Sequence, residues 1–185
     1  LDRALPVAGS FTRSWAIVRD LLPEGARDAI DRGVASYPDL LAEVSAGPVT
    51  LCHGDYRLDN VFFDSERDGE VIAFDWQFAC RARGTYDVAY FLALDLDPAL
   101  LAEHRDALLT EYVAGLRARG VEEYTLEACR HDYAVSLLLS TAVFAIGAVV
   151  NFQPALRRAD GGSPGPDAGA VPHARPTVRQ TTVLA

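Results

Sequence analysis

The chain has 185 residues, 50% of them hydrophobic, which is enough to bury the core of one domain and argues against a disordered protein. Its formal net charge of −9 argues against a sequence-independent nucleic-acid binder, which needs clustered Lys and Arg to displace counterions from phosphate. The three cysteines are widely spaced and suggest neither a disulfide framework nor a zinc site. The first twenty residues carry several charges instead of the apolar block of a secretory signal, so we expect a cytoplasmic protein.

The domain organisation follows from a change of composition near Arg157. Residues 1–156 carry the periodic apolar patterns of a folded domain. Residues 157–185 are rich in Gly, Pro and Ala without periodicity, and such a segment cannot bury enough apolar surface to offset its chain entropy. We therefore expect one domain over 1–156 and a disordered tail over 157–185.

The first fifty residues predict helices. Ser14 precedes an apolar run that Pro23 closes, which is typical of a short capped helix. Residues 24–46 carry an apolar stripe at helical spacing, which Pro38 is expected to break into two helices and Gly47 to end.

Three short β-type runs follow, at 49–52, 60–63 and 70–76. The Asp68-Gly69 pair between the last two is a strong hairpin signal. The polar segment between the first two runs is therefore predicted to be a loop between strands, followed by a hairpin that leads to Asp75.

The rest of the domain is predicted to be helical. A helix is expected over 86–94, a second begins at the Asp97-Pro98 cap and ends at Gly120, and Thr125 can cap a third. This last helix contains an uncharged run, 133–150, that is long enough to span a bilayer. Its serines, threonine and glycine and its lack of basic flanks favour a buried core helix, so we expect no membrane contact.

The polar loop and the hairpin carry the residues of chemical interest: His53, Gly54, Asp55, Asn60 and Asp75. Phosphoryl transfer from a nucleotide needs a carboxylate that orients the attacking hydroxyl and oxygen ligands that hold Mg²⁺ on the phosphates. A site with one or two protein ligands is normal for Mg²⁺. Two carboxylates and a side-chain amide meet these requirements. The plainer alternative for Asp55 and Asn60 is a turn whose side chains satisfy backbone groups.

These motifs carry a family resemblance. The segments CHGDYRLDN and IAFDWQ resemble the paired motifs of the aminoglycoside phosphotransferase and choline kinase superfamily, small-molecule kinases with a protein-kinase-like fold. The resemblance implies that Asp55 is the catalytic base and that Asn60 and Asp75 bind Mg²⁺ and the nucleotide. The segment GTYDVAYFL is similar to a family segment whose Asp supports the catalytic loop, here Asp87. We expect His53 to be structural as well, holding the loop by hydrogen bonds.

The resemblance also implies a fold and a reaction. The fold is expected to be a mostly helical α+β C-terminal lobe with a small β-hairpin sheet that carries the site. The reaction would transfer the γ-phosphoryl group of ATP, or of GTP, to a hydroxyl of a small molecule. The family's N-terminal lobe, with a nucleotide-covering loop and a strand Lys, has no counterpart in this chain, which contains no lysine. We therefore expect the chain alone to be weakly active or inactive.

Two other functions compete with this prediction. The chain can be a non-catalytic lobe that binds a ligand or partner. Alternatively, His53, Asp55 and Asp75 can be the metal ligands of a hydrolase, which requires a ring nitrogen of His53 to face the metal. The sequence does not name the acceptor, for which aminoglycosides, macrolides, choline-like amines, sugars and hydroxyacyl thioesters remain open.

Overall fold

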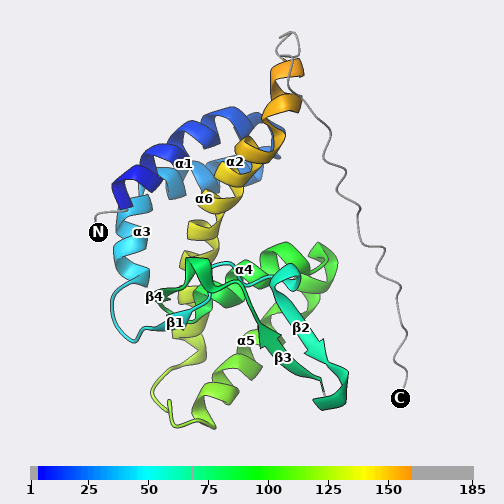
Figure 1. Ribbon diagram of the computed structural model, residues 1–185. Helices are drawn as coiled ribbons and strands as arrows, with labels where there is room; N and C mark the ends of the chain where they lie inside the picture. Colours follow the sequence, from blue (N-terminus) through cyan, green and yellow to red (C-terminus); the bar gives the residue numbers. More distant parts are fainter. Residues whose placement is uncertain (1–3, 68, 160–185) are drawn as a thin grey trace. The chain divides into compact units, whose positions relative to one another are not determined.

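The structure, a computed structural model, describes residues 4–67 and 69–159, and the chain divides into two compact units, Leu1–Asn151 and Phe152–Ala185. The first unit contains every predicted site residue. The predicted tail, residues 157–185, falls outside the described residues except for its first three, which belong to the last helix. The described residues are mostly helical with two small antiparallel sheets, which confirms the α+β class (Figure 1).

Three helices precede the first strand: α1 (Ala4–Val18), α2 (Glu24–Ala35) and α3 (Tyr37–Val44). The predicted start of a helix at Ser14 is wrong, because α1 begins ten residues earlier and Ser14 lies buried in its interior. The apolar and small residues upstream continue the helix, and Phe11, Trp15 and Val18 form its buried face. The predicted break near Pro38 is present, with the proline in the first turn of α3, where no backbone N–H is needed.

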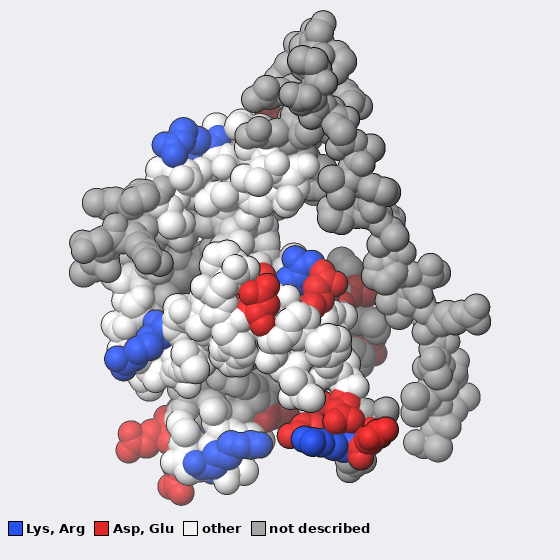
Figure 2. Space-filling model, viewed as in Figure 1, with Lys and Arg blue, Asp and Glu red and all other residues white. Residues whose placement is uncertain are grey.

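The four strands form two separate pairs. Strands β2 (Val61–Asp64) and β3 (Glu70–Ala73) make the predicted hairpin, with Val61 opposite Ala73. Its turn contains Gly69 at a φ of +77°, a conformation that favours glycine. Charges of both signs gather at the tip of this hairpin (Figure 2), where Arg67 lies near Asp64 and Glu70.

The second sheet was not predicted in full. Strand β1 (Thr50–Cys52) pairs antiparallel with β4 (Cys80–Ala82), a segment whose three residues show no strand pattern. Because β1 pairs with β4, the segment between them begins and ends at the same place in the fold. This segment contains the polar loop and the hairpin.

Helices α4 (Thr85–Asp95), α5 (Pro98–Arg117) and α6 (Leu126–Ala159) complete the fold. The two predicted caps are present, because the Asp97 carboxylate accepts the N–H of Ala99 at 2.8 Å and the Thr125 hydroxyl accepts the N–H of Ala128 at 3.1 Å.

Helix α6 takes part in both hydrophobic clusters of the first unit. Val135, Leu139 and Ala142 pack with the helices α1 to α3, while Cys129 and Tyr133 pack with α4 and α5. Figure 1 shows α6 passing both groups. The helix is long and apolar enough to cross a membrane by length and composition, but these buried side chains make it the central helix of the unit.

Candidate active site

The polar loop runs from His53 to Asn60 and joins β1 to β2. Both of its ends are fixed, since Cys52 pairs with Cys80 and Val61 pairs with Ala73. The last three residues of the loop form a single 3₁₀ turn, Leu58–Asn60, closed by the N–H of Asn60 donating to the carbonyl of Arg57 at 2.8 Å. The loop is therefore a short segment between two strand anchors, which favours a defined side-chain geometry.

Gly54 lies where the backbone of the loop contacts the 3₁₀ turn after β3, Trp76–Phe78. Its φ is +84°, and a Cβ atom at this position would lie 2.2 Å from the carbonyl oxygen of Phe78. No side chain fits at that distance, and the backbone conformation also favours glycine. The HGD motif thus contains Gly because two segments of backbone touch there.

His53 is 1% exposed, and both nitrogens of its ring are engaged. Nε2 donates to the carbonyl oxygen of Phe74 at 2.7 Å, and Nδ1 accepts the N–H of Asp55 at 3.3 Å. A carbonyl can only accept and an amide N–H can only donate, so the ring is the neutral tautomer with its proton on Nε2. Neither nitrogen is left to bind a metal, which counts against the hydrolase hypothesis.

Asp87, in the first turn of α4, holds the start of the loop. Its two oxygens accept the N–H of His53 at 2.6 Å and the N–H of Gly54 at 2.9 Å. Burial raises the pKa of Asp87 above its ordinary value, and the two N–H donors oppose this by stabilising the carboxylate. These bonds are of the kind expected for a residue that supports the loop.

The Asp55 carboxylate is held on both sides. Tyr90 Oη donates to Oδ1 at 2.8 Å, and Asn60 Nδ2 donates to Oδ2 at 3.0 Å and to the Asp55 carbonyl at 2.9 Å. Burial, and then the bond to the carboxylate, raises the pKa of Tyr90 far above its ordinary value, so the phenol keeps its proton. Sequence reasoning missed Tyr90, although its position three residues after Asp87 on a helix puts both side chains on one face.

Asn60 and Asp75 are brought close by the hairpin. The N–H of Phe74 donates to the carbonyl of Asn60 at 3.1 Å, which extends the β2–β3 ladder by one pair, and Asp75 is the next residue. Asp75 is exposed, and its backbone has the left-handed conformation, with φ 63° and ψ 57°. Asp is among the residues that tolerate this conformation, which otherwise marks strain and clusters at functional sites.

The donor atoms of these two residues suit a hard cation. Because the Asn60 amide nitrogen points at Asp55, its oxygen faces away from that carboxylate, and within the described part of the chain it accepts no hydrogen bond. The Asp75 carboxylate has only a 3.4 Å contact from Gln77 Nε2. The described residues contain no cluster of three or more His, Cys, Asp or Glu suited to a metal. An amide oxygen and one carboxylate therefore fit Mg²⁺ shared with phosphates better than a closed metal site.

Next to these oxygens the hairpin exposes an aromatic pair. Phe62 and Phe74 stack with ring centroids 4.7 Å apart, and Phe62 is 61% exposed. Phe62 is two residues after Asn60, and Phe74 directly precedes Asp75. The hairpin thus offers an apolar surface beside the candidate cation ligands.

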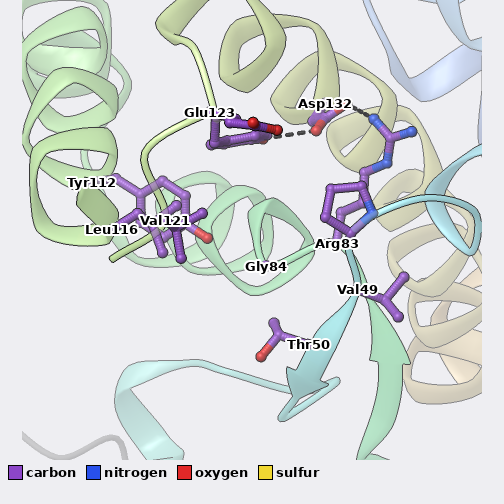
Figure 3. Close-up of a pocket in the computed structure, with 11 residues that line it drawn as sticks. Val49, Thr50, Arg83, Gly84, Tyr112, Leu116, Val121, Glu123 and Asp132 are labelled. Atoms are coloured by element: carbon purple, nitrogen blue, oxygen red, sulfur yellow. Dashed lines mark hydrogen bonds and ion pairs between the residues drawn. The ribbon is translucent and has the colours of Figure 1, made fainter. Parts of the chain in front are cut away.

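Two cavities lie near the loop, and they differ in what lines them. A cavity of about 240 Å³ is lined by Asp55 and Tyr90 among others. A larger one of about 580 Å³, shown in Figure 3, lies behind β1 between α5 and the start of α6, with Tyr112, Leu116 and Val121 along one side and the Arg83–Asp132 pair at another. None of the predicted site residues lines this cavity. We therefore do not assign the reaction site to it, although it is larger than the first.

Comparison with known proteins agrees with the motif. The sequence model of the phosphotransferase enzyme family matches residues 8–121, which include the loop, the hairpin, α4 and α5. No curated protein and no solved structure matches the chain significantly. The match thus covers the machinery of the candidate site but not helix α6.

Proposed function

Because the chain belongs to the phosphotransferase enzyme family, we propose that it transfers the γ-phosphoryl group of ATP or GTP to a hydroxyl group of a small molecule. The observation that carries this proposal is the Asp55 carboxylate, held between the Tyr90 hydroxyl and the Asn60 amide. In this reaction class the protein forms few bonds with the reacting atoms. Its task is to fix the acceptor oxygen and to stabilise the charge of the transferred group.

Asp55 is the proposed catalytic base. Each of its oxygens accepts one hydrogen bond from the protein and keeps a further lone pair for the acceptor hydroxyl. The carboxylate would orient that hydroxyl toward the phosphorus atom and take its proton as the new P–O bond forms and the bond to the nucleoside diphosphate breaks. Asn60 and Tyr90 keep the carboxylate from rotating away.

Asn60 and Asp75 are the proposed ligands of Mg²⁺, through the amide oxygen and the carboxylate. When bound, the ion neutralises charge on the β- and γ-phosphates and on the departing diphosphate. His53 fixes the backbone before Asp75 through the Phe74 carbonyl, so the histidine links the loop to the segment that carries Asp75.

The stacked Phe62 and Phe74 side chains supply a surface for the nucleotide base. Their position one and two residues from the cation ligands puts an apolar, exposed pair beside the phosphate end of the site. Base–aromatic stacking is worth about 1–3 kcal/mol per base. The chain contains no lysine, so a basic side chain of this chain that touches the phosphates would be an arginine. We also propose that the first unit is a lobe of the protein-kinase type.

The experiment separates nucleotide binding from phosphoryl transfer. Purified protein is heated with ATP or GTP, with and without Mg²⁺, and its unfolding temperature is compared with those of two variants. We expect the wild type and Asp55→Asn to be stabilised only when Mg²⁺ is present, and Asp75→Asn to lose this stabilisation. Asp55→Asn should then fail in phosphate transfer to alcohols that the wild type phosphorylates.

Two outcomes of this experiment would contradict the proposal. If neither nucleotide stabilises the wild type with Mg²⁺, the phosphotransferase proposal fails and the non-catalytic alternative is favoured. If Asp75→Asn responds like the wild type, Asp75 does not hold the ion.

A further inference from the structure

We propose that the 240 Å³ pocket beside Asp55 is the acceptor site, and that it takes a small alcohol whose hydroxyl is carried on a compact, apolar body without negative charge. This inference rests on the proposed function, since it names the substrate class of the same site. It follows from the position of the pocket, its size and the chemistry of its walls.

The position of the pocket ties its occupant to Asp55. Four parts of the fold line it: the polar loop, the segment that leads into β4, helix α4 and helix α6. The lining residues are Gly54, Asp55, Phe78, Cys80, Tyr86, Tyr90 and Val143. A molecule in this pocket therefore touches the proposed base on one side and α6 on the other.

The size of the pocket limits the part of the acceptor that it can enclose. Cavities that bury drug-sized ligands usually measure about 300–1,000 Å³. At about 240 Å³ the pocket is below this range, so it encloses a single ring or a short branched chain rather than several linked sugar rings. The larger cavity of Figure 3 has more space, but a hydroxyl bound there does not contact Asp55.

The walls of the pocket select against anions. Among the described lining residues, Asp55 is the one acidic side chain. None of the described lining residues is basic. A carboxylate or phosphate on the acceptor would thus face Asp55 without a partner, which costs free energy.

The remaining walls are apolar or aromatic. Phe78 is 59% exposed and Val143 is 38% exposed, so both leave apolar surface that a ligand in the pocket can cover. Tyr86 and Tyr90 contribute aromatic rings from α4, with centroids 6.4 Å apart. An apolar acceptor body would cover this surface while its hydroxyl reaches the carboxylate.

The test measures binding without nucleotide, by saturation-transfer NMR with 2-phenylethanol as the probe. We expect millimolar binding to the wild type, weakened at least about tenfold by Val143→Trp, which fills the pocket. The matched control is Val150→Trp on the same helix, where the side chain is 66% exposed and outside the pocket, and it should bind the probe like the wild type.

A second pair of variants keeps the test independent of folding defects. Phe78→Ala removes an exposed wall and should weaken probe binding about two- to tenfold, while Phe63→Ala removes an equally exposed ring of the hairpin, outside the pocket lining, and should not. 3-Phenyllactate, which carries a carboxylate beside its hydroxyl, should bind more weakly than 2-phenylethanol.

Three results would overturn the inference: equal binding of the two alcohols, equal effects of Val143→Trp and Val150→Trp, or equal effects of Phe78→Ala and Phe63→Ala. Failure of the proposed function is recognised separately. A wild type that binds 2-phenylethanol but is not stabilised by Mg²⁺ with ATP or GTP has the predicted pocket without the phosphotransferase site, and the acceptor role is then wrong.

Discussion

The Asp55 carboxylate is oriented by two donors that come from different parts of the sequence. Asn60 lies five residues away in the same loop, whereas Tyr90 lies on a helix thirty-five residues away. Because both carboxylate oxygens accept a bond, rotation about the side chain of Asp55 would break at least one of them. A half-buried carboxylate whose two oxygens are held by separate donors keeps one orientation.

Tyr90→Phe tests the contribution of the hydroxyl. The ring and its packing against Phe144 remain, so we expect a stability loss of only about 1 kcal/mol. The turnover number, which we expect to be low already in the wild type, should fall about ten- to hundredfold while the KM for the nucleotide is unchanged, because Asn60 alone then holds the carboxylate.

The control is Tyr133→Phe. Tyr133 lies on α6 in the cluster with α4 and α5, outside the pocket beside Asp55, and its hydroxyl does not bond Asp55, so its loss should leave the turnover number within about twofold of the wild type. Steady-state kinetics of both variants decide the question, and equal turnover in the two would show that Tyr90 does not position the base.

At the scale of secondary-structure elements, helix α4 carries the loop. Asp87 binds the N–H groups of His53 and Gly54, Tyr90 binds the Asp55 side chain, and the carboxylate of Asp95 accepts the N–H of Leu58 at 3.0 Å. Because an α-helix has 3.6 residues per turn, these three residues lie on one side of α4. One rigid helix therefore fixes the beginning, the middle and the end of the loop, which explains how a short polar segment keeps a defined shape.

Another contact between elements joins the first two helices. The Asp31 carboxylate on α2 accepts hydrogen bonds from Arg19, just after α1, and from Nε1 of Trp15 at 2.7 Å. The Arg19 and Trp15 donors lower the pKa of Asp31 from 3.8 to about 2. A lowered folded-state pKa means that the unfolded chain takes up the proton first as the pH falls.

The contribution of Asp31 to stability is thus complete above about pH 4 and is lost between pH 4 and pH 2. In thermal unfolding at several pH values, we expect Asp31→Asn to unfold at a lower temperature than the wild type near neutral pH, and the gap to narrow toward pH 2. Asp28→Asn, an exposed change on the same helix, should show no such convergence. A gap for Asp31→Asn that is constant with pH would contradict the assignment.

At the scale of the whole first unit, α6 connects the two hydrophobic clusters, and its buried Asp132 forms an ion pair with Arg83, whose side chain is 22% exposed. Asp132 is 1% exposed and binds the guanidinium of Arg83 and the hydroxyl of Tyr124, the latter at 2.7 Å. Arg83 lies between β4 and α4, and its Nε donates to the carbonyl of Ala46 at 3.3 Å. One charge cluster thus ties α6 to the sheet and to the helix that supports the active loop.

Asp132→Ala should therefore destabilise the unit strongly. Removal of one partner leaves the other charge without compensation in a largely buried place, which costs about 3–5 kcal/mol. Asp106→Ala, which breaks the exposed ion pair between Asp106 of α5 and Arg130 of α6, should cost at most about 1 kcal/mol. Urea unfolding of the two variants measures both changes, and similar losses would refute the structural role given to the buried pair.

Local signals predicted much of this fold. Asp97-Pro98 and Thr125 marked helix starts, and Asp68-Gly69 marked the hairpin, because caps and turns depend on the conformations and hydrogen bonds of a few neighbouring residues. Ser14 misled because a residue that can cap a helix can also lie inside one when packing buries the apolar residues on both sides of it, here Phe11, Trp15 and Val18. The pairing of β4 was missed, since three residues are too few to show a pattern.

The sequence by itself determined the family and the order of the polar residues, since the spacing of Asp55, Asn60 and Asp75 is a property of the chain alone. Only the tertiary structure decided that Tyr90 holds the Asp55 carboxylate, that both nitrogens of His53 are occupied, and that Val143 of α6 closes a small pocket beside the base. The physical reason is that these contacts join residues far apart in the chain. Packing of α4 and α6 brings them together, and no local preference of the backbone encodes that packing.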